Sequence, residues 1–200
     1  MSQPNYKRTK HSCYYTYVAM SSIFSLPPLL FVTFHDSYDI SYTWLGTLVL
    51  INFCTQLAID LIFSFFSKYF NIRYTLRVMP LLTSLGLFVY ALVPMIAPDI
   101  AYLGLAIGTV LFSVSAGLSE VLLSPTVAAL PSDTPERDMS LLHSLYAWGV
   151  LIVVVISTLF LTFVGTEYWM YLAMFWAVLP LVSCYLFCTS PIPDFAVNEN

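Results

Sequence analysis

Three ionisable side chains lie inside long apolar stretches of this sequence, and they are the first candidates for chemistry. They are Asp60, Glu120 and His143. An Asp or a Lys at the centre of a membrane helix costs at least about 2.5 kcal/mol on insertion scales, so such residues usually face a cavity or a partner. The chemistry that these residue types can supply is the exchange of protons and the binding of a polar solute.

Glu120 is the deepest of the three. It lies in GLSEVLLSPTVAALP, residues 117–131, where its neighbours are apolar or small. The next polar loop begins about ten residues later, or about 15 Å along a helix axis. Because no basic residue lies at its depth to pair with it, we expect Glu120 to take up and release a proton. The alternative is a permanently protonated acid that hydrogen-bonds to Ser124, one turn on.

A second group of polar side chains recurs at intervals of four residues. Asn52, Gln56 and Asp60 therefore share one face of a helix. The two amides either bind solute or hold neighbouring helices together. Asp60 either takes part in proton or solute binding, or forms a structural ion pair with Lys68 or Arg73.

His143 lies only two residues into an apolar stretch, near the expected lipid headgroups. A His at that depth can simply bond to loop carbonyls, which is the structural alternative to a role in proton or solute binding. With Ser119 in GLSE it faintly resembles the G-x-S-G motif and later His of intramembrane serine proteases. The fourth motif residue is Glu, and we expect Ser119 and His143 at different depths, so a hydrolase is the least favoured alternative.

The elements that must position these residues are membrane helices. Hydrophobic residues make up 59% of the chain and charged residues 9%, whereas a soluble domain carries about a quarter charged residues. Because a helix needs about 20 apolar residues to cross a bilayer, each long apolar run predicts one span. The predicted spans are about 14–34, 42–66, 76–96, 101–130, 141–164 and 168–188. We expect an all-α membrane bundle over residues 13–189, with a cytoplasmic lead at 1–12 and a tail or linker at 190–200.

The basic residues predict the orientation of this bundle. All seven fall in alternate loops, with none in the other three loops: Lys7, Arg8, Lys10, Lys68, Arg73, Arg77 and Arg137. By the positive-inside rule, both termini and the even-numbered connections are cytoplasmic. We therefore expect a multi-pass protein of the cell membrane, the plasma or inner membrane.

Small residues and prolines predict how the helices meet and bend. Gly104, Gly108 and Gly117 lie on one span, in small-xxx-small spacings that let a neighbouring backbone approach closely. Prolines within the spans, first of all Pro27 and Pro28, predict kinks.

The remaining apolar and aromatic residues predict the outer surface. The spans at 76–96 and 168–188 are almost wholly apolar, so we expect them to face lipid. Aromatic side chains near the outer interface fit an aromatic belt: Tyr42, Trp44, Tyr168 and Trp169. We interpret the four cysteines as small core residues, and we expect no metal site and no cofactor.

Four segments in order resemble the N-terminal half of a major facilitator superfamily transporter, in particular bacterial permeases of the fucose and proton symporter branch. The segments are LPPLLFVTF (26–34), INFCTQLAIDLIF (51–63), GLSEVLLSPTVAALP (117–131) and MSLLHSLYAWG (139–149). The resemblance covers roughly residues 14–193. It implies two inverted three-helix repeats, with spans one and four lining a cavity, spans two and five at the interface to a second half, and spans three and six outside.

The resemblance also implies roles for single residues. Glu120 matches a cavity carboxylate that couples protons to sugars, and Asp60 and Gln56 match a TQ…D pattern of span two. The gating loop of the superfamily aligns with SFFSKYFNIR, residues 64–73, where Lys68 replaces an expected acid and Arg73 is kept. The replaced acid normally helps to latch the cytoplasmic gate.

These observations predict the N-terminal half of a secondary active transporter for a small polar, sugar-like solute, driven by protons. Its expected partners are the lipid bilayer, the solute, protons, and a C-terminal six-helix half or a second copy of the chain. We expect no nucleic acid and no enzymatic activity. The main alternative is a structural or regulatory half that transports nothing.

Overall fold

The computed structural model describes residues 6–193, and over that range the chain is helical with no strand. The predicted all-α class is confirmed. The α-helices are α1 (Lys7–Leu29), α2 (Phe31–Tyr38), α3 (Tyr42–Phe66), α4 (Ile72–Ile96), α5 (Ala101–Ala128), α6 (Pro135–Phe163) and α7 (Trp169–Thr189). Single 3-10 turns, η1 (Ser67–Tyr69), η2 (Pro98–Ile100) and η3 (Thr166–Tyr168), precede α4, α5 and α7.

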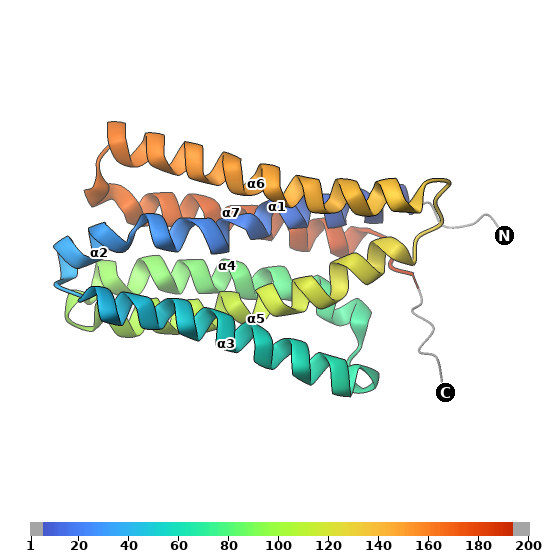
Figure 1. The fold of residues 1–200 in the computed structure, drawn as a ribbon, viewed down its shortest axis with the longest axis horizontal. Helices are drawn as coiled ribbons and strands as arrows, with labels where there is room; N and C mark the ends of the chain where they lie inside the picture. The colour runs from blue at the N-terminus through green and yellow to red at the C-terminus, as the bar shows by residue number, and fades with distance from the viewer. Residues whose placement is uncertain (1–5, 194–200) are drawn as a thin grey trace.

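The long helices lie lengthwise beside one another, with α3 and α6 at the two edges of the view in Figure 1 and α1, α7, α4 and α5 between them. All seven basic residues lie at one end of this bundle, near the start of α1, the connection from α3 to α4, and the start of α6. We call this end the basic end, and the other the opposite end.

Within residues 6–193, five helices are long and apolar enough to cross a membrane, and the number is six if α1 and α2 form one broken span. These two helices meet at 48°. The break follows Pro27 and Pro28, which lack the N–H groups that would bond to the carbonyls of Ile23 and Phe24. The first helix also begins earlier than predicted, at Lys7, so part of the predicted polar lead is helical. The rest of that lead, residues 1–5, and residues 194–200 of the predicted tail lie outside the described residues.

Local sequence explains where several helices begin. The Ser41 hydroxyl accepts a hydrogen bond from the Trp44 N–H at 3.4 Å, and the Asn71 side chain accepts one from the Tyr74 N–H at 3.1 Å. Each satisfies a backbone donor that the first helical turn leaves without an internal partner. Pro135 occupies the first position of α6, where its missing N–H costs nothing.

Glycines allow the helices around α5 to pack closely. A Cβ atom on Gly108 would lie 2.7 Å from the Gly86 carbonyl oxygen of α4, and one on Gly104 would overlap Val93. On another face of α5, a Cβ atom on Gly117 would lie 2.9 Å from the Ile59 side chain of α3. The predicted small residues therefore lie where α5 meets two different neighbours.

The two almost wholly apolar spans, expected to face lipid, are more buried in the bundle than α3 and α6. In the most apolar windows, 50% of the residues are buried in α4 and 39% in α7, against 17% in α3 and 17% in α6. The two almost wholly apolar helices pack on each other, whereas α3 and α6 leave most of their surface uncovered. Of the cysteines, which were predicted in the core, Cys13 is buried, but Cys54 and Cys188 are exposed.

One member of the predicted aromatic belt lies in the core instead. Tyr42, Trp44 and Tyr168 are 54%, 57% and 44% exposed, but Trp169 is only 1% exposed. Its ring packs edge-on against Phe34 of α2, with ring centroids 4.8 Å apart. The prediction for Trp169 was wrong because the first residue of α7 faces the bent helix α2, which offers an apolar surface.

Candidate functional site

A cavity of about 420 Å³ lies between α1, α5 and α6 in the half of the bundle nearer the basic end. Helices α1 and α5 each supply polar and apolar side chains to this cavity, and α6 supplies two aromatic ones. Its lining residues are Tyr17, Met20, Phe24, Ala116, Ser119, Glu120, Ser124, His143 and Tyr146. We call this the carboxylate cavity. Three residues that the sequence proposed for one site, Glu120, Ser124 and His143, meet here.

Glu120 is the acidic residue in the wall of the carboxylate cavity. It lies eight residues before Ala128, the last residue of α5, or about 12 Å along the helix axis. Its side chain is exposed, and it forms no hydrogen bond or ion pair with any residue between 6 and 193. The site therefore holds a carboxyl group without a fixed partner beside open space.

Two tyrosines complete the polar part of this cavity. The Tyr17 hydroxyl lies 3.5 Å from the Ser124 hydroxyl, so Ser124 pairs with α1 rather than with Glu120. The Tyr17 ring lies edge-on to His143 at 5.9 Å and to Tyr146 at 5.6 Å, measured between ring centroids. The sequence predictions omitted both tyrosines from the site. A signal for Tyr146 existed, because it follows His143 by three residues and shares its helix face.

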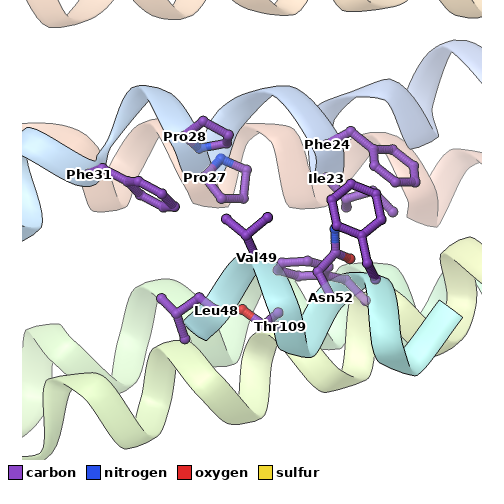
Figure 2. A pocket seen from close by; sticks show the side chains of 11 residues that line it. Ile23, Phe24, Pro27, Pro28, Phe31, Leu48, Val49, Asn52 and Thr109 are labelled. Atoms are coloured by element: carbon purple, nitrogen blue, oxygen red, sulfur yellow. The ribbon is translucent and has the colours of Figure 1, made fainter. Parts of the chain in front are cut away.

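A second cavity of about 180 Å³ continues toward the opposite end, between α1, α3 and α5. Figure 2 shows the two prolines of α1 above Val49 and Asn52 of α3. The lining is mostly apolar: Ile23, Phe24, Pro27, Pro28, Phe31, Leu48, Val49, Asn52, Phe53, Thr109 and Phe112. We call this the apolar cavity. Phe24 belongs to the lining of both cavities.

The amides of α3 connect it to α5. Asn52 Oδ1 accepts hydrogen bonds from Gln56 Nε2 at 2.8 Å and from the Ser113 hydroxyl at 2.5 Å. Gln56 is buried, whereas Asn52 also borders the apolar cavity. The two amides were predicted either to bind solute or to hold helices together. The structure shows the second role in the bond from Ser113 to Asn52, and Asn52 also lies in the wall of the apolar cavity.

Asp60 continues the same face of α3 but does not line either cavity. One of its carboxylate oxygens, Oδ1, is buried and has no hydrogen-bond partner in residues 6–193. Lys68, a predicted partner, instead places its ammonium 5.2 Å from the centroid of the Tyr69 ring. Lys68 lies in η1 and Arg73 in the first turn of α4, so both predicted gating residues are at the basic end.

The serine and histidine of the hydrolase alternative both line the carboxylate cavity, although we expected them at different depths. The Ser119 hydroxyl donates to the carbonyl of Ser115 at 2.8 Å and lies 3.7 Å from the Met79 sulfur. No hydrogen bond joins Ser119 to His143 in the described part of the chain. A nucleophile and base must lie within hydrogen-bond reach of each other, so this geometry gives that alternative no support.

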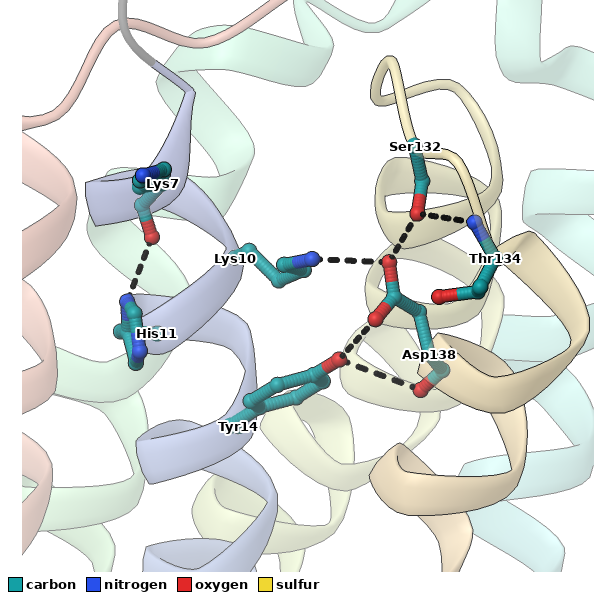
Figure 3. Close-up of polar contacts among 7 residues, drawn as sticks. All are labelled: Lys7, Lys10, His11, Tyr14, Ser132, Thr134 and Asp138. Carbon is teal, nitrogen blue, oxygen red and sulfur yellow. Dashed lines mark hydrogen bonds and ion pairs between the residues drawn. The ribbon is translucent and has the colours of Figure 1, made fainter.

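A polar network at the basic end joins α1 to α6 (Figure 3). The Lys10 ammonium lies 2.8 Å from Asp138 Oδ2, which also accepts a hydrogen bond from the Ser132 hydroxyl at 2.7 Å. The Tyr14 hydroxyl donates to Asp138 Oδ1 at 3.2 Å. Sequence analysis did not propose this network, because 128 residues separate Lys10 from Asp138.

Comparison with known proteins finds no protein-family model that matches this chain and no curated protein that matches it. The chemistry must therefore be inferred from the site itself. A carboxyl group without a partner among the described residues, two phenols and an imidazole line one cavity, which shares Phe24 with the apolar cavity. These groups can bind a small molecule and exchange protons with it or with water.

Proposed function

We propose that this chain is the N-terminal six-helix half of a secondary active transporter of the major facilitator type. The transporter moves a small polar solute, and a proton gradient drives this movement. The observation that carries the proposal is Glu120, a carboxyl group with no partner among the described residues, in the wall of a cavity of about 420 Å³. Intramembrane carboxyl groups placed in this way are typical of proton relays in transporters.

The helix pairings support the inverted repeat that such a fold requires. The main pairs are α4 with α5, α1 with α7, α1 with α6, α3 with α5, α4 with α7, and α1 with α5. Exchanging α1 with α5, α3 with α6 and α4 with α7 converts this set of pairs into itself. Because α1 and α5 run in opposite directions, the exchange relates two three-helix units of inverted topology (Figure 1).

The position of the cavities supports alternating access. Both cavities lie along the two helices that the exchange relates, α1 and α5, and the largely uncovered helices α3 and α6 flank them. A second six-helix half, either a separate polypeptide or a second copy of this chain, would pack against α3 and α6 and close the path. Rocking of the two halves would then open the path to each side in turn, and Glu120 would release its proton when the path opens inward.

The basic end would face the cytoplasm. All seven basic residues lie there, and cytoplasmic loops carry the excess of Lys and Arg in membrane proteins. Both ends of the six-helix unit would then be cytoplasmic, with Lys68 and Arg73 at the inner mouth of the path.

Proton movement in proteoliposomes tests the proposal. The chain is reconstituted alone and with a candidate second half, a pH-sensitive dye is enclosed, and a panel of small polar solutes is added outside. We expect the entry of one solute to be accompanied by inward movement of protons. Glu120→Gln should abolish this proton movement but should retain the passive exchange of solute that needs no proton gradient. Glu136→Gln is the matched control, because Glu136 is an exposed acid at the start of α6. Solute uptake against a gradient that survives Glu120→Gln would contradict the proposal, and the absence of any flux would favour a structural or regulatory half.

A further inference from the structure

The carboxylate cavity combines negative charge with aromatic rings. Glu120 lines it, and no Lys or Arg is among the lining residues. All basic residues of the chain belong to the basic end, in the connections and the first two turns of the helices. A solute that enters this cavity therefore meets one acidic side chain, Glu120, and no Lys or Arg in the wall.

The aromatic rings are arranged in a chain of edge-to-face contacts. Phe24 and Tyr146 lie 6.0 Å apart at an interplanar angle of 74°, and Tyr146 and Tyr17 lie 5.6 Å apart at 65°. All three rings, two from α1 and one from α6, belong to the wall of the carboxylate cavity. The face of an aromatic ring attracts a cation, most strongly where water is excluded.

Two of the polar groups that line the cavities already have hydrogen-bond partners. The Ser119 hydroxyl already donates to a backbone carbonyl, and Asn52 Oδ1 already accepts two hydrogen bonds. Phe24 also lines the apolar cavity, whose wall includes Phe31 and Phe112. This arrangement matches a solute with one charged end and one apolar end.

We infer that the solute is an organic ammonium ion, whose cationic head lies between Glu120, Tyr17 and Tyr146 and whose apolar part extends past Phe24 into the apolar cavity. This inference depends on the proposed function for its biological meaning, but the binding site is a property of this chain. The carboxylate supplies the countercharge, and the two phenol rings supply the faces that stabilise a head group without N–H donors. The apolar cavity gives affinity for the remainder of the molecule.

Equilibrium binding to the purified chain in nanodiscs tests the inference. The probes are choline and its neutral carbon isostere, in which a tert-butyl group replaces the trimethylammonium group. Because the two have nearly the same shape, a difference in affinity reports the charge alone. We expect choline to bind at least about tenfold more tightly than the isostere. We also expect hexyltrimethylammonium to bind more tightly than tetramethylammonium, because its chain reaches the apolar cavity.

Variants connect the binding to the named residues. Glu120→Gln should weaken choline binding about tenfold and leave binding of the neutral isostere unchanged, whereas Glu136→Gln should change neither. Tyr146→Leu should weaken choline binding, and Tyr146→Phe, which keeps the ring, should restore it. Equal affinities for choline and the isostere, or choline binding that is unaffected by Glu120→Gln, would overturn the inference.

The inference and the proposed function fail in different ways. If choline binds as described but no proton gradient drives its movement, the ammonium site stands and the transport proposal fails. If a neutral solute is taken up with protons and choline neither binds nor competes, the transport proposal stands and the ammonium site fails. A folded chain that binds none of the probes also overturns the ammonium site.

Discussion

Lys10 and Asp138 form an ion pair of 2.8 Å that joins the first helix of the chain to the first turn of α6. Their side chains are 26% and 11% exposed, so water screens the pair only partly. The Asp138 carboxylate also accepts hydrogen bonds from Ser132 and Tyr14. This one carboxylate therefore holds α6, which has few other neighbours besides α1, to the rest of the bundle at the basic end.

Asp138→Ala should destabilise the chain by about 1.5 kcal/mol, because three donors lose a charged acceptor. For a protein of this size the loss corresponds to a decrease in melting temperature of about 3–6 °C. The measurement is thermal unfolding in detergent followed by intrinsic fluorescence. Asp133→Ala is the control, since Asp133 is an exposed acid of the same loop. Equal melting temperatures for the two variants would show that the network contributes nothing to stability.

Gly108→Ala should destabilise the chain by about 2 kcal/mol, since the added methyl group would meet the backbone of α4 at 2.7 Å. The matched variant is Gly46→Ala, because no atom lies within 4 Å of the position of its Cβ. Alanine has the higher helix propensity, so Gly46→Ala should be neutral or stabilising by up to about 1 kcal/mol. Unfolding of both variants in mixed micelles of increasing denaturing detergent gives the comparison. A Gly108→Ala variant as stable as Gly46→Ala would contradict the close packing of α4 and α5.

Ser157→Ala should destabilise the contact between α6 and α7 by about 1 kcal/mol, because it removes the acceptor of the buried Trp176 indole N–H. The hydrogen bond measures 3.0 Å, and Ser157 is fully buried. Tryptophan emission should change together with stability. Ser144→Ala is the control, since the Ser144 hydroxyl is exposed and bonds only to a carbonyl of its own helix. Similar effects of the two substitutions would mean that the bond to Trp176 has no special weight.

Some features of this fold follow from local sequence. Long apolar runs predict the spans, because the length and composition of a helix decide whether it can cross a bilayer. The pair Pro27 and Pro28 predicts the break in the first span, because two missing N–H groups weaken the helix wherever it is placed. Six residues were proposed for proton coupling or solute binding. Glu120, Ser124 and His143 line one cavity and Asn52 lines the other, whereas Gln56 and Asp60 line neither.

Other features depend on contacts that no local pattern contains. Trp169 fits an aromatic belt equally well by type and position, and only the bend of α2 above it decides that it is buried. Lys10 and Asp138 meet because α1 packs on α6, which the spacing of charges does not reveal. The apolar helices α4 and α7 pack on each other, because complementary surfaces rather than mean hydropathy decide which helix becomes buried.

The orientation of the bundle makes a separate prediction. In a variant without native cysteines, Glu167→Cys at the opposite end should react with a membrane-impermeant maleimide in intact cells. Asp133→Cys at the basic end should react only after the cells are permeabilised. Both positions are exposed, so access to the reagent decides the result. The reverse labelling pattern would place the basic end outside and contradict the proposed orientation.

The protonation state of Glu120 is the central claim, and infrared difference spectroscopy measures it directly. Spectra of the chain in lipid are recorded as the buffer is changed from mildly alkaline to acidic, and the carboxylic acid band of the native chain is compared with that of Glu120→Gln and of the control Glu136→Gln. We predict that the band that grows with acid contains a component that is missing in Glu120→Gln and is kept in Glu136→Gln. A Glu120→Gln spectrum identical to the native one would show that this carboxyl group does not exchange protons, and would contradict the account.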